Sequence, residues 1–468
     1  MFGSTLGLTI STLAGLAAGL AREWLLVAAW GAGERSDAFL VAMFLPEALR
    51  MMLAAGILSA AALPLYAQRD DQQQRQWLHA QSWALLLVGL LLGALLTLAA
   101  PLLVQLIGGG MTEAARQSAT ATLRVLGWTV PGLLLHSLWS IALQARQRFV
   151  LAGLGSLLFN LPIVATLALH RDGGMTTTGL AQSAVLGSVL MALALLPAAL
   201  RHGWRPWHPD VQLPLLRELW RQLAPLLLSS GASHALSLLE RLMASFLGEG
   251  AVTWLNLARK FINLPLIALM ALNQVLLGLM SGQQGANRLV ILRKGLALST
   301  LLCLPAALGL IVASPLLPAL LAAIPPDSPL PALLAWLCLP LVFGAWNALL
   351  ARYAYANADT RTPLRCELLG GLVNALALLA LTLPLGLTGV AMAALSGVLA
   401  TNVLLVRQLK LQAVWSWGHQ WLLQAVLLAG SLTWLQPLDL APWPRLLLAT
   451  AVALAVLLLC GWRLKPWR

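Results

Sequence analysis

Nine charged side chains lie in stretches of the sequence that are otherwise apolar. The six basic residues are Arg22, Arg50, Arg124, Arg241, Arg259 and Lys260, and the three acidic residues are Glu23, Glu47 and Glu240. A full charge at the centre of a bilayer costs about 2.5 to 3.5 kcal/mol on insertion scales, so such residues usually face a bundle interior or a watery cavity. Because the cations outnumber the carboxylates, the pattern predicts a site for an anion. The planar fork of arginine suits the paired oxygens of a diphosphate.

These cations do not all favour a buried site to the same degree. Arg124 lies near enough to a helix end to extend its side chain to the membrane surface, whereas Arg22 and Arg50 lie deeper in their stretches. Spacings of three and four place a further polar set on one helix face, namely Asn256, Arg259, Lys260 and Asn263. This face predicts that the stretch 253–280 lines a cavity.

The composition indicates which elements must position these residues. Of the 468 residues, 60% are hydrophobic and 10% are charged, with a mean hydropathy of +0.83, far from the usual balance of soluble domains. Apolar stretches of roughly 18 residues or more recur, each long enough to cross ~30 Å of hydrocarbon as a helix. The sequence therefore predicts an all-α polytopic membrane protein with about fourteen transmembrane helices. We expect them near residues 5–30, 37–66, 80–106, 119–142, 149–169, 177–200, 223–247, 253–280, 295–316, 329–351, 365–384, 386–406, 418–436 and 443–462.

The connections between these helices carry unequal numbers of basic residues. Alternating the helices across the bilayer places 19 of the 29 Lys and Arg residues on one side, four on the other and six inside helices. Because basic loops stay in the cytoplasm, both termini are expected to be cytoplasmic. This spread over short loops accounts for most of the net charge of +13 without a nucleic-acid partner.

An internal repeat relates the first two helices to the seventh and eighth. Residues 20–46 align without gaps with residues 239–265. The alignment pairs Arg22 with Arg241, Gly31 with Gly250, Asp37 with Asn256 and Pro46 with Pro265. Because both copies begin on the same side of the membrane, the repeat is parallel and predicts two lobes about an axis along the membrane normal.

Four segments follow from this repeat. We expect an N-lobe of helices 1–6 in residues 1–200, a C-lobe of helices 7–12 in residues 223–410, and two extra helices in 411–468. A basic, Trp-rich linker at 201–222 joins the lobes, either on the anionic lipid surface or free in solvent.

Other kinds of site are not indicated. The four cysteines have no metal-binding spacing, the histidines are scattered, and no loop contains a glycine-rich phosphate-binding motif. We therefore expect no metal, no cofactor and no enzymatic activity. A membrane glycosyltransferase and a structural scaffold remain the alternatives to a transporter.

Three segments resemble the MurJ/MviN family of flippases. AREWLLVAAWGAGERSDAFLVAMFLPEALRMMLAAGILSAAALPLYA (21–67) resembles the first two helices of that family, ASFLGEGAVTWLNLARKFINLP its helices seven and eight, and ANADTRTPLR (356–365) a later loop. The resemblance implies the multidrug/oligosaccharidyl-lipid/polysaccharide exporter superfamily and a place in the bacterial inner membrane. It also implies that an undecaprenyl-diphosphate-linked saccharide moves from the cytoplasmic to the periplasmic leaflet by alternating access.

The resemblance also assigns roles to residues. Arg22, Asp37 and Arg50 match positions that line the family's cavity, and Arg241, Arg259, Lys260 and Asn263 are expected to join them. The two N-lobe arginines would meet the diphosphate, so that the cargo supplies the charge that compensates Arg22. Glu23, Glu47 and Glu240 would support this network, and Asp359 with Arg361 would order a loop. Asp37 has an alternative interpretation as a helix N-cap.

Two departures from the family pattern concern the cargo. Arg259, Lys260 and Asn263 stand where the peptidoglycan flippases carry Asp-Arg and then Glu, and Met51 and Ala55 replace an Arg and a Glu after Arg50. This loss of acidic residues favours an exopolysaccharide repeat unit, with lipid II of peptidoglycan synthesis as the alternative. Expected partners are the lipid-linked saccharide, membrane lipids, and polysaccharide polymerase or export proteins, with residues 411–468 as the candidate groove for the lipid tail.

Overall fold

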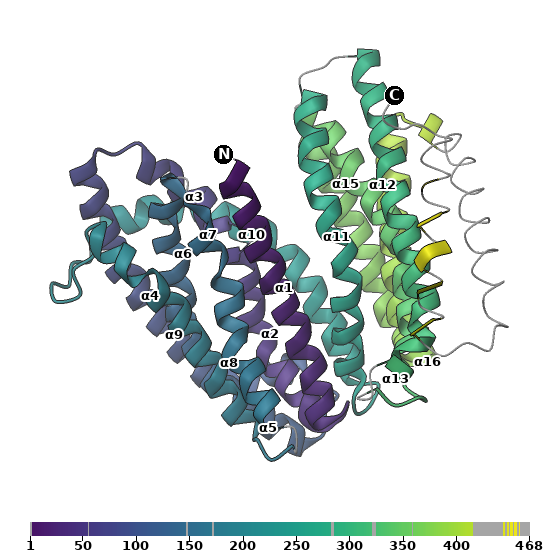
Figure 1. The fold of residues 1–468 in the computed structure, drawn as a ribbon, viewed down its shortest axis with the longest axis horizontal. Helices are drawn as coiled ribbons and strands as arrows, with labels where there is room; N and C mark the ends of the chain where they lie inside the picture. Colours follow the sequence, from purple (N-terminus) through teal and green to yellow (C-terminus); the bar gives the residue numbers. More distant parts are fainter. Residues whose placement is uncertain are drawn as a thin grey trace. The chain divides into compact units, whose positions relative to one another are not determined.

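The fold is entirely helical over the part of the chain that the structure describes. The structure is a computed structural model that describes residues 2–54, 56–146, 148–170, 173–281, 285–320, 324–357 and 359–414, with short stretches beyond. By contacts, the chain forms two compact units, residues 1–253 and 254–468. Figure 1 shows the helices of both units as a ribbon.

The first unit holds the helices that carry the predicted N-terminal charges. Its helices are α1 (Phe2–Trp30), α2 (Glu34–Ala54), α3 (Ile57–Ala67), α4 (Asp71–Ile107), α5 (Glu113–Leu126), α6 (Val130–Ala145), α7 (Phe149–Gly153), α8 (Gly155–Leu169), α9 (Thr177–Arg201) and α10 (Leu213–Ser245). Side chains at the helix starts satisfy free backbone donors: Asp70 forms a capping box with Gln73, and Thr112 and Thr176 cap α5 and α9. Each cap lies in a connection between two predicted spans and marks where the following helix begins.

The second unit begins within a helix. Its helices are α11 (Ala251–Ser281), α12 (Gly285–Ala313), α13 (Leu317–Leu320), α14 (Leu330–Cys338), α15 (Pro340–Ala356) and α16 (Arg361–Gln408). Gly386 has φ +61° and divides α16 into two helical segments. A residue with positive φ cannot continue an α-helix, so the helix breaks at Gly386. This break lies at the boundary of the predicted spans 365–384 and 386–406.

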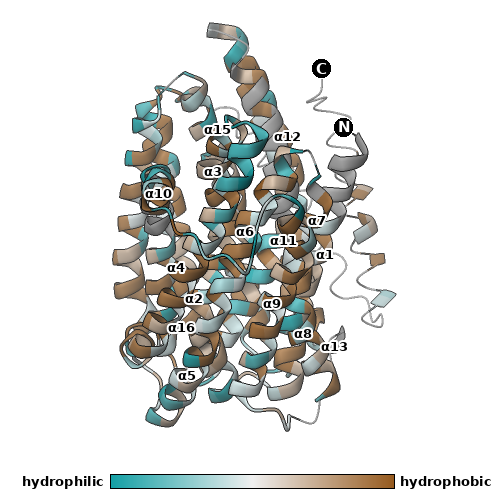
Figure 2. Cartoon of the chain, turned by 90° about the vertical axis from the view of Figure 1, so that its left-hand side faces the viewer, coloured by the Kyte–Doolittle hydropathy of each residue, from teal (hydrophilic) through white to brown (hydrophobic). Residues whose placement is uncertain are grey.

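Eight helical segments of the described chain are long and apolar enough to cross a membrane. They lie at Leu13–Trp30, Glu34–Ala67, Asp71–Ile107, Glu113–Ala145, Thr177–Arg201, Gly285–Leu316, Leu330–Ala356 and Arg361–Gln408. The long helices are coloured mainly as hydrophobic in Figure 2. The predicted class of polytopic all-α membrane protein is thereby confirmed, and the first twelve predicted spans all coincide with helix.

Two regions of the predicted organisation need separate comment. The last two spans, 418–436 and 443–462, lie almost wholly outside the described residues. The linker 201–222 is a loop only over residues 202–212, because residues 213–222 form the first turns of α10. The division into lobes at 200 and 223 stays a prediction.

Candidate functional site

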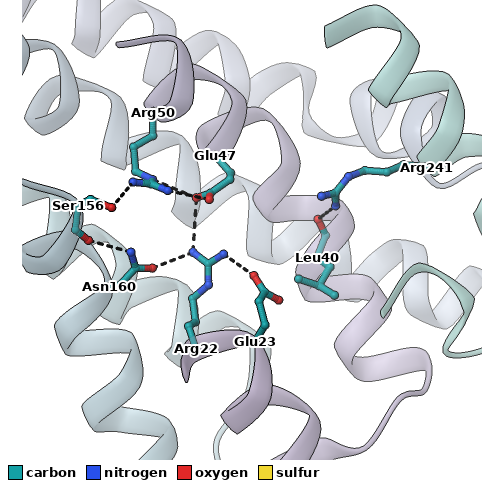
Figure 3. A network of polar contacts seen from close by, with 8 residues as sticks. All are labelled: Arg22, Glu23, Leu40, Glu47, Arg50, Ser156, Asn160 and Arg241. Carbon is teal, nitrogen blue, oxygen red and sulfur yellow. Dashed lines mark hydrogen bonds and ion pairs between the residues drawn. The ribbon is translucent and has the colours of Figure 1, made fainter. Parts of the chain in front are cut away.

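Two arginines and two glutamates form a buried ionic network between α1 and α2. Arg22 is 2% exposed, and its guanidinium donates through Nη2 to Glu23 Oε1 at 2.5 Å and through Nη1 to Glu47 Oε2 at 3.4 Å. Arg50 donates to both oxygens of Glu47, at 3.1 Å from Nε and 2.8 Å from Nη2. Glu47 is therefore a bridging carboxylate that is shared by two guanidinium groups (Figure 3).

Polar residues of α8 complete this network. Arg22 Nη1 donates to Asn160 Oδ1 at 3.1 Å, and Arg50 Nη1 donates to Ser156 Oγ at 2.9 Å. Asn160 is fully buried and donates from Nδ2 to the Ser156 carbonyl at 2.8 Å, which fixes its amide orientation. Neither side chain was predicted from the sequence, although Ser156 and Asn160 are four residues apart in an apolar stretch and therefore share a helix face.

A glycine in α1 lets the two helices approach closely enough for these contacts. A Cβ at Gly15 would lie 2.7 Å from Ser156 Cβ, a separation that real Cβ atoms essentially never show. Gly19 lies one turn further along, beside the Asn160 amide. Because α1 and α8 touch at Gly15, Arg22 two turns later can reach Asn160.

The network is electrically balanced by the protein itself. Arg22 and Arg50 face Glu23 and Glu47, whereas the sequence suggested that the cargo would supply the charge that compensates Arg22. Of the two glutamate side chains, Glu23 is 2% exposed and Glu47 is 13% exposed. Glu47 is thus the carboxylate with better access to an incoming ligand. Arg22 Nε is buried and has no hydrogen-bond partner among the described residues.

Arg241 of α10 contacts α2 near the Glu47 bridge, close enough for the charges of Glu23 and Glu47 to act on it. Its Nη1 donates to the Leu40 carbonyl at 2.9 Å, and its guanidinium lies 4.7 Å from the centre of the Phe44 ring. Figure 3 shows its guanidinium at the Leu40 carbonyl of α2. Glu240, the preceding residue, is half-buried. Arg241 thus contacts the same helix that carries Glu47 and Arg50, but a different turn of it.

Asp37 caps a helix, although not its own. It lies in the first turn of α2 and accepts from the backbone N–H of Gly250 at 2.7 Å and of Thr253 at 2.8 Å, and from the Thr253 hydroxyl at 2.5 Å. These donors belong to the start of α11, whose first N–H groups have no partner within the helix. Both Asp37 oxygens are therefore used in joining the start of α2 to the start of α11.

The loops that precede α2 and α11 share one backbone feature. Gly31 and Gly250, which the internal repeat pairs, have φ +71° and +81°. In both copies a left-handed glycine separates an Arg-bearing helix from the next helix. A side chain at Gly250 would also come within 2.8 Å of the Ala32 carbonyl oxygen.

The remaining predicted residues lie in the second unit and are described there alone. Arg259 and Lys260 are half-buried on α11, and Asn263 is exposed. Asp359 Oδ1 accepts from the backbone N–H of Arg361 at 3.1 Å and of Thr362 at 3.0 Å, at the start of α16. Hydrogen bonds from Thr362 lower the pKa of Asp359 below its ordinary value. The cavity role of the α11 set stays a prediction.

Comparison with known proteins places the chain in one family. The family model described as "Lipid II flippase MurJ" matches residues 26–438. The lipid II flippase MurJ of Burkholderia cenocepacia is 26% identical over 91% of this chain and 87% of its own, and the probable lipid II flippase MurJ of Thermotoga maritima is 25% identical over 87% and 85%.

Solved structures give the same fold. A structure of "Lipid II flippase MurJ, inward closed conformation" has a TM-score of 0.84 at 19% identity and covers 98% of both chains. An inward-facing multidrug transporter of the MATE family has a TM-score of 0.68 at 16% identity and covers 88% of this chain and 99% of its own. Both likenesses concern the fold.

Proposed function

This chain belongs to the MurJ family of lipid-linked saccharide flippases, which are transporters and not enzymes, and we propose that it moves lipid II from the cytoplasmic to the periplasmic leaflet. The proposal rests on the carboxylate bridge of Glu47 between Arg22 and Arg50. A group that accepts from two guanidinium forks at once is the contact that a diphosphate would make.

We infer that the diphosphate takes the place of Glu47 on the two arginines. Glu47 is the more accessible carboxylate of the network. Without Glu47, Arg22 is still held by Glu23 on α1 and by Asn160 on α8. When the anion binds, Arg22 and Arg50 keep a shared counterion while Glu47 is released toward solvent. This exchange avoids leaving either guanidinium as an unpaired buried charge.

We choose lipid II as the cargo because the relatives support it more strongly than the changed residues of α11 support another saccharide. The named relatives are lipid II flippases, which supports the peptidoglycan precursor over an exopolysaccharide repeat unit. Arg259, Lys260 and Asn263 remain the observation in favour of a different saccharide. We place the chain in the inner membrane with cytoplasmic termini, working by alternating access, without an assigned polymerase or export partner.

The test is flipping of fluorescent lipid II in proteoliposomes. Arg22→Gln should abolish flipping in protein that keeps its elution profile, with a lowered thermal midpoint because the buried Glu23 loses its partner. Arg22→Lys should restore little flipping because lysine lacks the bidentate fork. Arg116→Gln is the matched control, since Arg116 is half-buried and, among the described residues, forms its ion pair with Glu113 at 2.6 Å. Normal flipping by Arg22→Gln would overturn the diphosphate site.

The same liposomes can decide the cargo. An undecaprenyl-diphosphate-linked exopolysaccharide repeat unit, labelled in the same way, competes with lipid II for the wild-type protein. We expect lipid II to be moved preferentially. Preferential movement of the repeat unit would leave the flippase proposal standing and replace its substrate.

A further inference from the structure

The first unit contains an apolar groove that the proposed transport site does not use. It has a volume of about 500 Å³ and lies among α2, α3, α4, α6 and α10, a size within the usual range of ligand pockets, roughly 300 to 1,000 Å³. Its walls include Leu53, Leu58, Leu85, Leu134 and Leu223. Arg217 is the one charged residue among the groove's lining residues. Because the walls are apolar, the groove suits a hydrocarbon chain and not ordered water.

A second, polar cavity adjoins the groove at the start of α10. Its volume is about 550 Å³, its lining includes Arg217, Glu218 and Arg221, and it shares Leu213 and Arg217 with the apolar groove. The shared residues place an apolar space and a cationic space next to each other along α10. An amphiphile with an anionic head and an apolar chain matches that change.

The charges that line the polar cavity favour an anion. Glu218 is neutralised, because Arg69 donates to its Oε2 at 2.7 Å. Arg217 and Arg221 are exposed, have no ion pair within the described ranges, and lie four residues apart, so the two like charges face each other on one helix side. A phosphate between them would relieve this repulsion.

We propose that this space binds one anionic glycerophospholipid, with an acyl chain in the groove and the phosphate on Arg217 and Arg221. The bilayer supplies this occupant at high local concentration, and basic segments beside the membrane attract such lipids. The polyprenyl chain of the proposed cargo does not fit as well, because its volume is several times the groove's volume of about 500 Å³. The argument for this lipid site does not rest on the proposed flippase activity.

The position of the groove gives the lipid a structural task. Its walls come from both sides of the break between α2 and α3, where Gly56 has φ +85°. Leu49 and Leu53, on the turns that flank Arg50, both line it. The acyl chain therefore braces the segment of α2 that presents Arg50 and Glu47.

Native mass spectrometry of the full chain tests the site. Protein from nanodiscs of mixed phosphatidylglycerol and phosphatidylcholine should retain one phosphatidylglycerol, and the double variant Arg217→Gln/Arg221→Gln should lower this retention at least tenfold. Arg201→Gln/Arg205→Gln is the matched control, because it removes two charges near the same linker but outside the groove lining. Its retention should equal that of the wild type.

A second variant tests the groove without altering charge. Leu92 lines the groove and is 38% exposed, so Leu92→Trp fills the groove without disturbing the core. It should also lower phosphatidylglycerol retention. Equal retention of the two phospholipids, unchanged retention in Leu92→Trp, an equal loss in the control, or displacement of phosphatidylglycerol by undecaprenyl phosphate would each overturn the proposal.

Discussion

Glu47 accepts hydrogen bonds from Arg22 and Arg50, so the charge balance of the buried network depends on this one carboxylate. Glu23 forms its ion pair with Arg22, and the contacts from Asn160 and Ser156 are neutral. A buried guanidinium that loses its counterion keeps the full cost of its desolvation. Arg22, Arg50 and Glu47, which we propose as the diphosphate site, are thus also residues on which the stability of the fold depends.

Glu47→Gln should lower stability and increase the effect of the ligand. Removing one partner of a buried ion pair typically costs about 3 to 5 kcal/mol, so the thermal midpoint in detergent should fall clearly. If a diphosphate replaces Glu47, lipid II should raise that midpoint more in Glu47→Gln than in the wild type. A smaller ligand-induced rise in the variant would contradict the exchange of Glu47 for diphosphate.

His202, directly after α9, should make stability depend on pH. It is buried, accepts at Nε2 from Arg146, and donates from Nδ1 to the Ala198 carbonyl at 2.6 Å. Burial, and then the positive charge of Arg146, lower its pKa below the ordinary value. The unfolded chain therefore binds the proton more readily, so the contribution of His202 is complete above about pH 6.5 and is lost as the pH falls through the lowered pKa.

Thermal unfolding at pH 7.5 and pH 5.5 measures this dependence. The midpoint should fall further for the wild type than for His202→Gln, whose side chain can hydrogen-bond but does not titrate in this range. The same pH dependence in both proteins would exclude His202 as its source.

At the scale of elements, close approaches between helices decide which polar side chains meet. Gly15 allows α1 to touch α8 at Ser156, and Asp37 joins α2 to the beginning of α11. The left-handed glycines at 31 and 250 turn the chain in equivalent places of the two repeats. The site is therefore built by helix ends and contact points, and the long apolar faces only hold it in the membrane.

Two glycine substitutions should have effects of opposite sign. Gly15→Ala places a methyl group against Ser156 and should destabilise by about 1 to 3 kcal/mol, as overpacking does, with loss of flipping because Arg22 moves from Asn160. Gly371→Ala, also in a helix, meets no atom within 4 Å and should stabilise by about 0.5 to 1 kcal/mol. Comparing their thermal midpoints checks both, and equal midpoints would refute the contact argument.

At the scale of the whole molecule, two compact units and a run of apolar helices describe a multi-pass membrane protein. The unequal distribution of basic residues sets its expected orientation. Of the 29 Lys and Arg residues, 19 lie on the side that we assign to the cytoplasm.

Cysteine labelling checks this orientation. Arg205→Cys, in the loop after α9, should react with a membrane-impermeant maleimide only from the cytoplasmic side. Arg116→Cys, in the first turn of α5, should react from the periplasmic side. Both variants are made in a Cys460→Ser background, which serves as the blank, because Cys303, Cys338 and Cys366 are buried and Cys460 lies outside the described residues. Labelling of both variants from one side would refute the alternation of the helices.

The sequence by itself determined the class of the protein, the helical stretches of the first twelve predicted spans, the family, and the burial of Arg22 and Arg50. These are local properties, because hydropathy, helix length and motif spacing act over neighbouring residues. Only the tertiary structure decided the partners: Glu47 between two arginines, Asn160 and Ser156 beside them, and Asp37 at the start of α11. Such pairings join residues far apart in the chain, as Arg22 and Asn160 are, and depend on where two helices approach, which hydropathy and spacing do not specify.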